Sequence, residues 1–103
     1  MSDINQLIEH GLDLTTRSLY FGESITEESA GKFIRLFMIL DKLSSDRPIN
    51  IFLNCDGGEW EHGMAMFSVV RRSRNYIVMT VLGQAQSMGS ILLQAAAERV
   101  IDQ

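Results

Sequence analysis

The feature that most constrains the fold is a short apolar run, residues 49–54, that is followed closely by two adjacent glycines. Its odd-numbered residues point to one face of an extended chain and are apolar, and Phe52 makes the other face apolar as well. Strands that are apolar on both faces are typical of parallel sheets covered by helices. Gly57 and Gly58 then predict a turn whose backbone takes a positive φ or approaches a ligand closely.

The same order of apolar run, turn and amphipathic stretch repeats along the chain. It predicts strands at 17–21, 49–54 and 76–82, with the beginning of a fourth at 98–102. Helices are expected from the N-cap Thr26 to about Leu43, from Trp60 to the basic residues at 71–74, and in the apolar run 91–97. Alternating strands and helices predict one α/β domain with a parallel sheet layered with helices. The helix residues expected in the core are Ala30, Phe33, Ile34, Phe37, Met38, Leu40, Leu43, Trp60, Met64, Phe67 and Val70.

Composition narrows the class of protein. The 103 residues suit a single domain, and a net charge of −4 without a basic stripe argues against a nucleic-acid partner. A single cysteine, Cys55, rules out an intramolecular disulfide framework and a cysteine zinc cluster, and we expect no metal or cofactor. The absence of a long apolar run and of a secretory signal predicts a cytoplasmic protein that does not span a membrane.

The N-terminal residues 1–16 are expected to form an arm or short helix, and residues 17–103 the α/β domain. Apolar residues at positions 4, 7 and 8 have helical spacing, Gly11 is a natural stop, and residues 12–16 form a connector. His10 falls at the end of that helix, where it favours the helix electrostatically. His62 points off the apolar stripe of its helix. We assign neither histidine a catalytic role.

Ser87 lies where the third apolar strand has ended at Gly83 and a new helix begins. Two interpretations are open at this point. A serine at a helix N-terminus commonly caps the free backbone amides. Alternatively, the hydroxyl is a nucleophile, whose tetrahedral intermediate those same amides can stabilise.

Two spaced motifs, residues 53–58 (Leu-Asn-Cys-Asp-Gly-Gly) and residues 83–89 (Gly-Gln-Ala-Gln-Ser-Met-Gly), resemble the Clp protease proteolytic subunit family. Residues 17–22 (Arg-Ser-Leu-Tyr-Phe-Gly) and 25–28 (Ile-Thr-Glu-Glu) are similar to its first strand and to the start of the following helix. The resemblance covers about residues 17–102. It implies a crotonase-like α/β fold of repeated ββα units.

The resemblance also implies roles for four residues. Ser87 matches the nucleophile, the N–H groups of Gly58 and Met88 match the oxyanion hole, and Gly57 shapes the substrate-binding loop. The implied activity is that of a subunit of an ATP-dependent serine endopeptidase that hydrolyses peptide bonds of unfolded polypeptides. Such subunits form homo-oligomeric rings and receive their substrates from an ATP-driven unfoldase, and they need no cofactor.

This sequence departs from the family pattern after the nucleophile. The family's histidine base and acidic residue follow the serine, whereas residues 88–103 contain no histidine. We therefore expect a truncated, incomplete fold that has little or no peptidase activity alone, since a serine without a base is a weak nucleophile. An open sheet edge should also make the isolated chain associate.

Smaller departures surround the glycine pair and leave alternatives open. Cys55-Asp56 replaces the family's Ser-Pro. The Asp56 side chain either points inward, where its charge would oppose a developing oxyanion, or points outward, where it caps the next helix. The outward position is preferred. Gln86 replaces a small alanine and either narrows the site or adds a hydrogen bond. Cys55 is expected to be a buried small residue rather than a nucleophile. The alternative functions are a non-catalytic structural or regulatory subunit and a crotonase-fold acyl-CoA enzyme.

Overall fold

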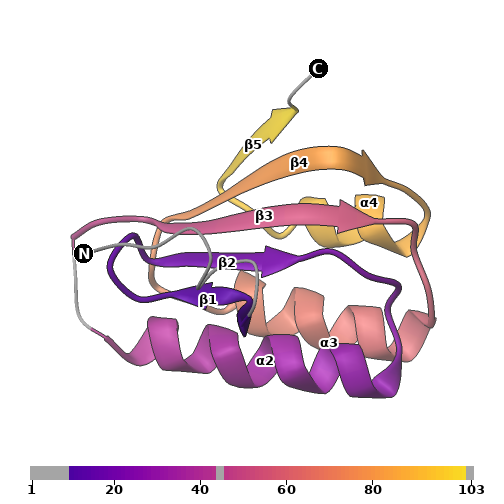
Figure 1. Cartoon of the computed structure of the whole chain (residues 1–103), viewed down its shortest axis with the longest axis horizontal. Coiled ribbons are helices and arrows are strands. Elements are labelled where there is room, and N and C mark those ends of the chain that lie inside the picture. Colours follow the sequence, from indigo (N-terminus) through magenta and orange to yellow (C-terminus); the bar gives the residue numbers. More distant parts are fainter. Residues whose placement is uncertain (1–9, 44–45, 102–103) are drawn as a thin grey trace.

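The computed structural model describes residues 10–43 and 46–101, which form one sheet with helices packed against it (Figure 1). The elements in chain order are β1 (Leu12–Asp13), β2 (Ser18–Phe21), α2 (Glu27–Lys42), β3 (Ile49–Cys55), α3 (Trp60–Arg71), β4 (Ile77–Ala85), α4 (Met88–Leu93) and β5 (Glu98–Ile101). The predicted alternation of strands and helices is confirmed. The predicted N-terminal helix lies almost wholly outside the described residues.

The sheet has the strand order β1-β2-β3-β4-β5. Strands β2 to β5 are parallel, as predicted, and β1 pairs antiparallel with β2. The register aligns Leu19, Ile51 and Met79 across β2, β3 and β4, and all three side chains are buried. Strand β1 lies where the sequence predicts a connector, because two residues give no detectable alternation.

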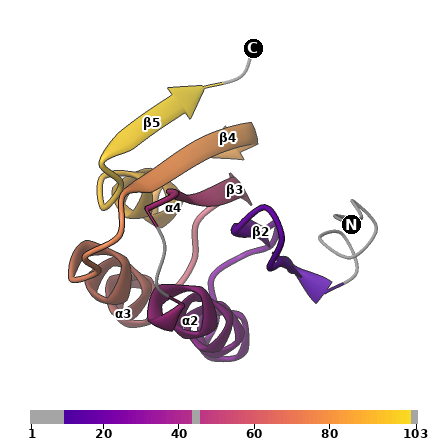
Figure 2. The ribbon, with the colours of Figure 1, turned by 90° about the vertical axis from the view of Figure 1, so that its left-hand side faces the viewer.

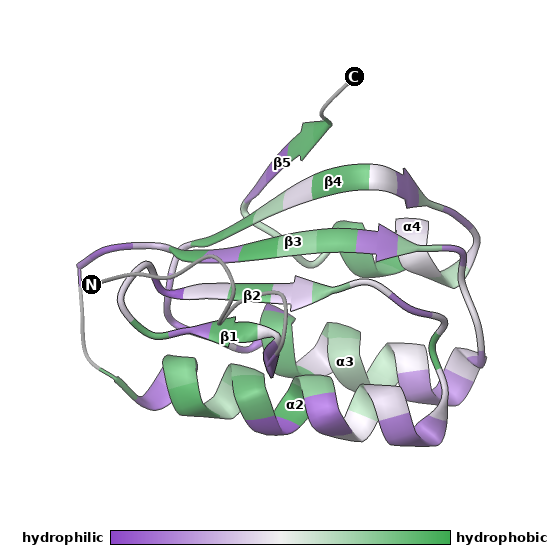
Figure 3. Ribbon diagram, in the orientation of Figure 1, coloured by the Kyte–Doolittle hydropathy of each residue, from purple (hydrophilic) through white to green (hydrophobic). Residues whose placement is uncertain are grey.

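The helices α2, α3 and α4 lie on the same side of the sheet (Figure 2). Alternate residues of β3 are therefore fully buried against them, whereas Phe52 on the other face is half-buried. The expectation of a sheet covered on both faces is thus wrong for the described residues. Figure 3 shows the hydrophobic centres of β3 and β4, which form the middle of the core.

Helix α2 begins at the predicted N-cap. The Thr26 side chain accepts a hydrogen bond from the Ser29 N–H, and the Ser29 side chain accepts one from the Thr26 N–H, so the two residues form a capping box. Phe33 packs edge-to-face on Phe21 of β2, with ring centroids 5.7 Å apart. The predicted core stripe is buried at Ala30, Phe33, Phe37 and Leu40, but Met38 and Leu43 are exposed, because they lie off the face that meets the sheet.

The boundaries and buried face of the later elements differ from the predictions. Helix α3 buries Gly63, Met66 and Val70. Of its predicted stripe, Val70 is thus confirmed and Met64 and Phe67 are partly buried against the core, whereas the Trp60 side chain is 63% exposed. Strand β4 continues past Gly83 to Ala85, and α4 ends at Leu93, well before the end of the apolar run 91–97. Strand β5 confirms the predicted fourth strand, and all four of its residues are exposed. Among the described elements, only β1–β2–α2 has the two strands per helix that the resemblance implies.

Candidate active site

A β-bulge at the end of β4 brings the two sequence motifs together. The register pairs Leu53 with Val81 and then Cys55 with Ala85, so β3 advances two residues while β4 advances four. Gly83 accommodates the extra residues with a φ of +92°. The Gln86 N–H then donates to the Cys55 carbonyl oxygen at 3.0 Å, and this bond holds the C-terminal ends of β3 and β4 side by side. The loops after β3 and β4 therefore meet at one edge of the sheet (Figure 1).

Ser87 has a strained backbone and an uncommitted hydroxyl. Its φ of 52° and ψ of −122° lie in a region that non-glycine residues rarely adopt. Ser87 occupies the N-cap position of α4, but its side chain makes no capping hydrogen bond and is exposed. The capping interpretation is therefore wrong. A serine at a sharp, strained strand-to-helix turn presents its hydroxyl to an approaching substrate.

Gly57 lies directly beside Ser87. A Cβ placed on Gly57 would be 2.9 Å from the Ser87 Cβ and 3.4 Å from its Oγ. Gly57 has a φ of +114° and is buried. Glycine at this position therefore permits both the turn and the close approach of its backbone to the serine.

Two backbone N–H groups near Ser87 have no acceptor among the described residues. Gly58 forms a parallel bridge with Ile25 in which the Gly57 carbonyl accepts from the Ile25 N–H and the Glu59 N–H donates to the Ile25 carbonyl. Successive residues of an extended chain direct their N–H groups to opposite sides, so the Gly58 N–H points away from Ile25. In the first turn of α4, the N–H groups of Gly89 and Ser90 are bonded, whereas that of Met88 is not.

Close packing fixes α4 in place behind these amides. A Cβ on Gly63 of α3 would lie 2.3 Å from the Met88 Cγ, and a Cβ on Gly89 would lie 3.0 Å from the Cys55 carbonyl oxygen. The Met88 side chain is 3% exposed. The position of the Met88 N–H is thus determined by contacts with β3 and α3. A glycine inside a helix lowers its stability, and this cost at Gly63 is the sequence signal that could have revealed the contact.

The structure decides the orientation of Asp56, which the sequence left open. The Asp56 Oδ1 accepts a hydrogen bond from the Ser24 hydroxyl at 2.7 Å. Asp56 thus lies on the Ile25 side of the turn, as preferred, but the predicted cap is wrong, because the N-cap of α3 is Glu59 and has no side-chain cap bond. The Gln86 side chain is exposed, and its backbone bonds both Cys55 and Gly89.

Cys55 is buried, as predicted, and its sulfur takes part in the turn. The Gly57 N–H donates to the Cys55 Sγ at 3.3 Å. Burial raises the pKa of the Cys55 thiol; the Gly57 hydrogen bond opposes this rise, and the Asp56 charge adds to it. A thiol whose pKa is raised is less reactive, which agrees with a structural role.

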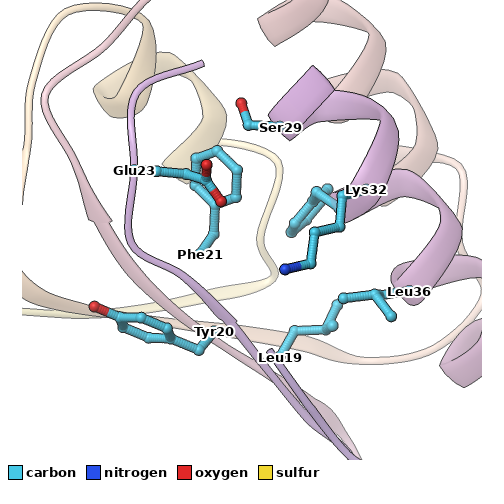
Figure 4. Close-up of a pocket in the computed structure, with 8 residues that line it drawn as sticks. Leu19, Tyr20, Phe21, Glu23, Ser29, Lys32 and Leu36 are labelled. Atoms are coloured by element: carbon cyan, nitrogen blue, oxygen red, sulfur yellow. The ribbon is translucent and has the colours of Figure 1, made fainter. Parts of the chain in front are cut away.

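The remaining candidate functional groups among the described residues have contacts that do not involve Ser87. His62 has its Nε2 4.0 Å from the Glu61 carboxylate. A hollow of about 20 Å³, room for about one water molecule, lies between β2 and α2, where Lys32 reaches from α2 toward β2 (Figure 4). The described residues contain no cluster of metal-ligating side chains, and no described helix is long and apolar enough to cross a membrane.

Comparison with known proteins identifies the family to which this arrangement belongs. The model of the family described as Clp protease matches residues 6–100. The chain belongs to the Clp protease family. Its fold is similar to that of ClpP1 from Listeria monocytogenes, with a TM-score of 0.76 and 23% sequence identity over 91% of this chain and 52% of that one. The fold class is therefore the crotonase-like α/β fold, as expected.

Curated relatives are longer than this chain. The chain is 32% identical over 97 residues to the ATP-dependent Clp protease proteolytic subunit 1 of Chlamydia muridarum, which covers 94% of this chain and 50% of that protein. It is 29% identical over 82 residues to the ATP-dependent Clp protease proteolytic subunit of Deinococcus radiodurans, covering 80% of this chain and 40% of that protein. The chain thus spans about half the length, or less, of these relatives.

Proposed function

We propose that this chain carries the nucleophile and oxyanion hole of a Clp-type serine endopeptidase subunit. The observation that carries the proposal is the strained backbone of Ser87, whose hydroxyl makes no capping hydrogen bond and lies beside Gly57. Strain persists where the surrounding structure enforces it, and such positions cluster at functional sites. Membership of the Clp protease family supports the same reaction class.

Each site residue has a role in peptide hydrolysis. The Ser87 Oγ attacks the scissile carbonyl carbon, and the carbonyl oxygen gains the negative charge. The N–H groups of Gly58 and Met88 stabilise this oxyanion, because they are fixed by the sheet and by α4 before the reaction begins. Gly57 shapes the loop along which an extended substrate binds. A base must take the Ser87 proton.

The partners follow from the same proposal. Substrates are unfolded polypeptides that an ATP-driven unfoldase delivers to a cytoplasmic, homo-oligomeric ring of these subunits. The relatives' names support the ATP dependence and the status of a subunit within a larger enzyme.

Active-site labelling tests the proposal. A fluorophosphonate should label Ser87 in the protein encoded by the longest reading frame that contains residues 1–103, and Ser87→Ala should abolish the labelling. Ser68→Ala, which changes an exposed serine on α3, is the matched control and should keep it. For residues 1–103 alone we expect no labelling, because no histidine follows Ser87.

The opposite results would identify the alternatives. A longer protein that forms rings without being labelled would be a non-catalytic subunit. Tight binding of an acyl-CoA, without labelling, would indicate a crotonase-type enzyme. Stoichiometric labelling of residues 1–103 alone would show that this chain recruits a base from elsewhere.

A further inference from the structure

The turn that carries Gly57 and Gly58 is fastened by the loop between β2 and α2. The Ile25 N–H donates to the Gly57 carbonyl oxygen at 2.8 Å, and the Glu59 N–H donates to the Ile25 carbonyl oxygen at 3.0 Å. The Ser24 hydroxyl adds a third bond, at 2.7 Å, to the Asp56 carboxylate. The segment 24–25 is thus bonded along the whole turn 56–59, on the side away from the Gly58 N–H.

The segment 24–25 is itself anchored to Ser29, a buried residue in the first turn of α2. The Ser29 hydroxyl donates to the Ser24 carbonyl oxygen at 2.8 Å, and Ser29 is 5% exposed. Ser29 also forms the capping box with Thr26. A continuous set of hydrogen bonds therefore runs from Ser29, at the N-terminal end of α2, through Ser24 to Asp56. A restraint with such an anchor can hold a loop in position, because the anchor itself does not move easily.

Two properties of Asp56 make a restraint on this residue important for the turn. Aspartate leaves its own φ free, whereas the proline of the family pattern fixes φ near −65°. A carboxylate that turned toward the Gly58 N–H would also oppose a developing oxyanion. The bond to Ser24 counteracts both effects, since it limits the motion of the turn and holds the carboxylate on the Ile25 side.

We propose that Ser24 and Asp56 are positioning residues for the oxyanion hole. Their hydrogen bond holds the turn 56–59 so that the Gly58 N–H stays directed away from Ile25 and the Asp56 charge stays away from that N–H. Their importance for catalysis rests on the proposed peptidase function. The restraint itself is a property of this chain and can be measured without activity.

Hydrogen exchange measured by mass spectrometry on the whole chain tests the restraint. Loss of the bond in Ser24→Ala or Asp56→Ala should speed exchange of the 56–60 amides about three- to tenfold. Asp56→Asn keeps the acceptor oxygen and Ser24→Thr keeps the donor, so both should exchange like the wild type. The double variant, Ser24→Ala with Asp56→Ala, should be no faster than either single variant. Thr16→Ala is the control, because it removes another hydroxyl hydrogen bond, a part-buried one to Ser18 at 2.8 Å, far from the turn in sequence.

Three results would overturn the proposal. The first is unchanged exchange in Ser24→Ala, and the second is equal acceleration in Asp56→Asn and Asp56→Ala. The third is an acceleration spread evenly over β3 and β4, which would show a general loss of stability. In the protein encoded by the longest reading frame that contains residues 1–103, Asp56→Ala should lower kcat for a short peptide with KM unchanged, and Asp56→Asn should restore it. A wild type without hydrolysis would contradict the proposed function, while the exchange data would still decide the restraint.

Discussion

Replacement of Ser87 by glycine should stabilise the protein. The φ of 52° and ψ of −122° at this residue are unfavourable for any residue with a Cβ. Strain of this kind costs about 1–3 kcal/mol. Glycine relieves it but increases the conformational entropy of the unfolded chain, which costs about 0.5–1 kcal/mol. The net expectation for Ser87→Gly is an increase of about 1 kcal/mol in the free energy of unfolding.

Ser87→Ala is the matched control for this prediction. The hydroxyl is exposed and forms no cap bond, so its removal should change stability by less than about 0.5 kcal/mol. A capping serine would behave differently, because its replacement by alanine costs about 0.5–2 kcal/mol. The two variants together therefore separate a strained nucleophile from a helix cap.

Urea unfolding followed by circular dichroism, at one protein concentration for all variants, measures these differences. A gain of about 1 kcal/mol corresponds to a rise in Tm of about 4–8 °C for a domain near this size. Two results together would refute the reasoning: a loss of about 1 kcal/mol in Ser87→Ala and no gain in Ser87→Gly. They would mean that the serine stabilises α4 and that its backbone is not strained.

Three further predictions concern packing, protonation and association. Gly63→Ala should destabilise the chain by about 1–3 kcal/mol in urea unfolding, because the new methyl group meets the Met88 side chain. Gly31→Ala is the control and should not destabilise the chain, because a Cβ on this helical glycine has no contact closer than 3.2 Å. Equal effects of the two substitutions would contradict the packing argument. Because the pKa of the Cys55 thiol is raised, the folded state keeps a proton that the unfolded state loses, so the free energy of unfolding should fall as the pH rises above about 8.5. Cys55→Ala should remove this part of the pH dependence. The same slope of stability against pH in the wild type and in Cys55→Ala, from about pH 7.5 to 9.5, would contradict the prediction. Because β5 is exposed along its whole length, sedimentation velocity at tens of micromolar should show species heavier than the 11.6 kDa monomer; a single sharp monomer boundary would contradict it.

Local patterns in the sequence determine most of the architecture. Thr26 followed by acidic residues predicts the start of α2, and the apolar run 49–54 predicts a central strand, since capping and burial depend on residues that are close in sequence. The two glycine-containing motifs also identify the family, which the match over residues 6–100 confirms. The residues assigned to the site, Ser87, Gly58, Met88 and Gly57, remain part of the proposal.

Tertiary structure alone decides how those residues meet. The bulge at Gly83 shifts β4 against β3 and so places Ser87 beside Gly57, and no local pattern reveals a shift in strand pairing. The same holds for the bond between Ser24 and Asp56, which lie 32 positions apart and come together because β2 and β3 pair in parallel. Local sequence specifies which groups are present, but packing between distant segments sets the direction in which each amide and hydroxyl points.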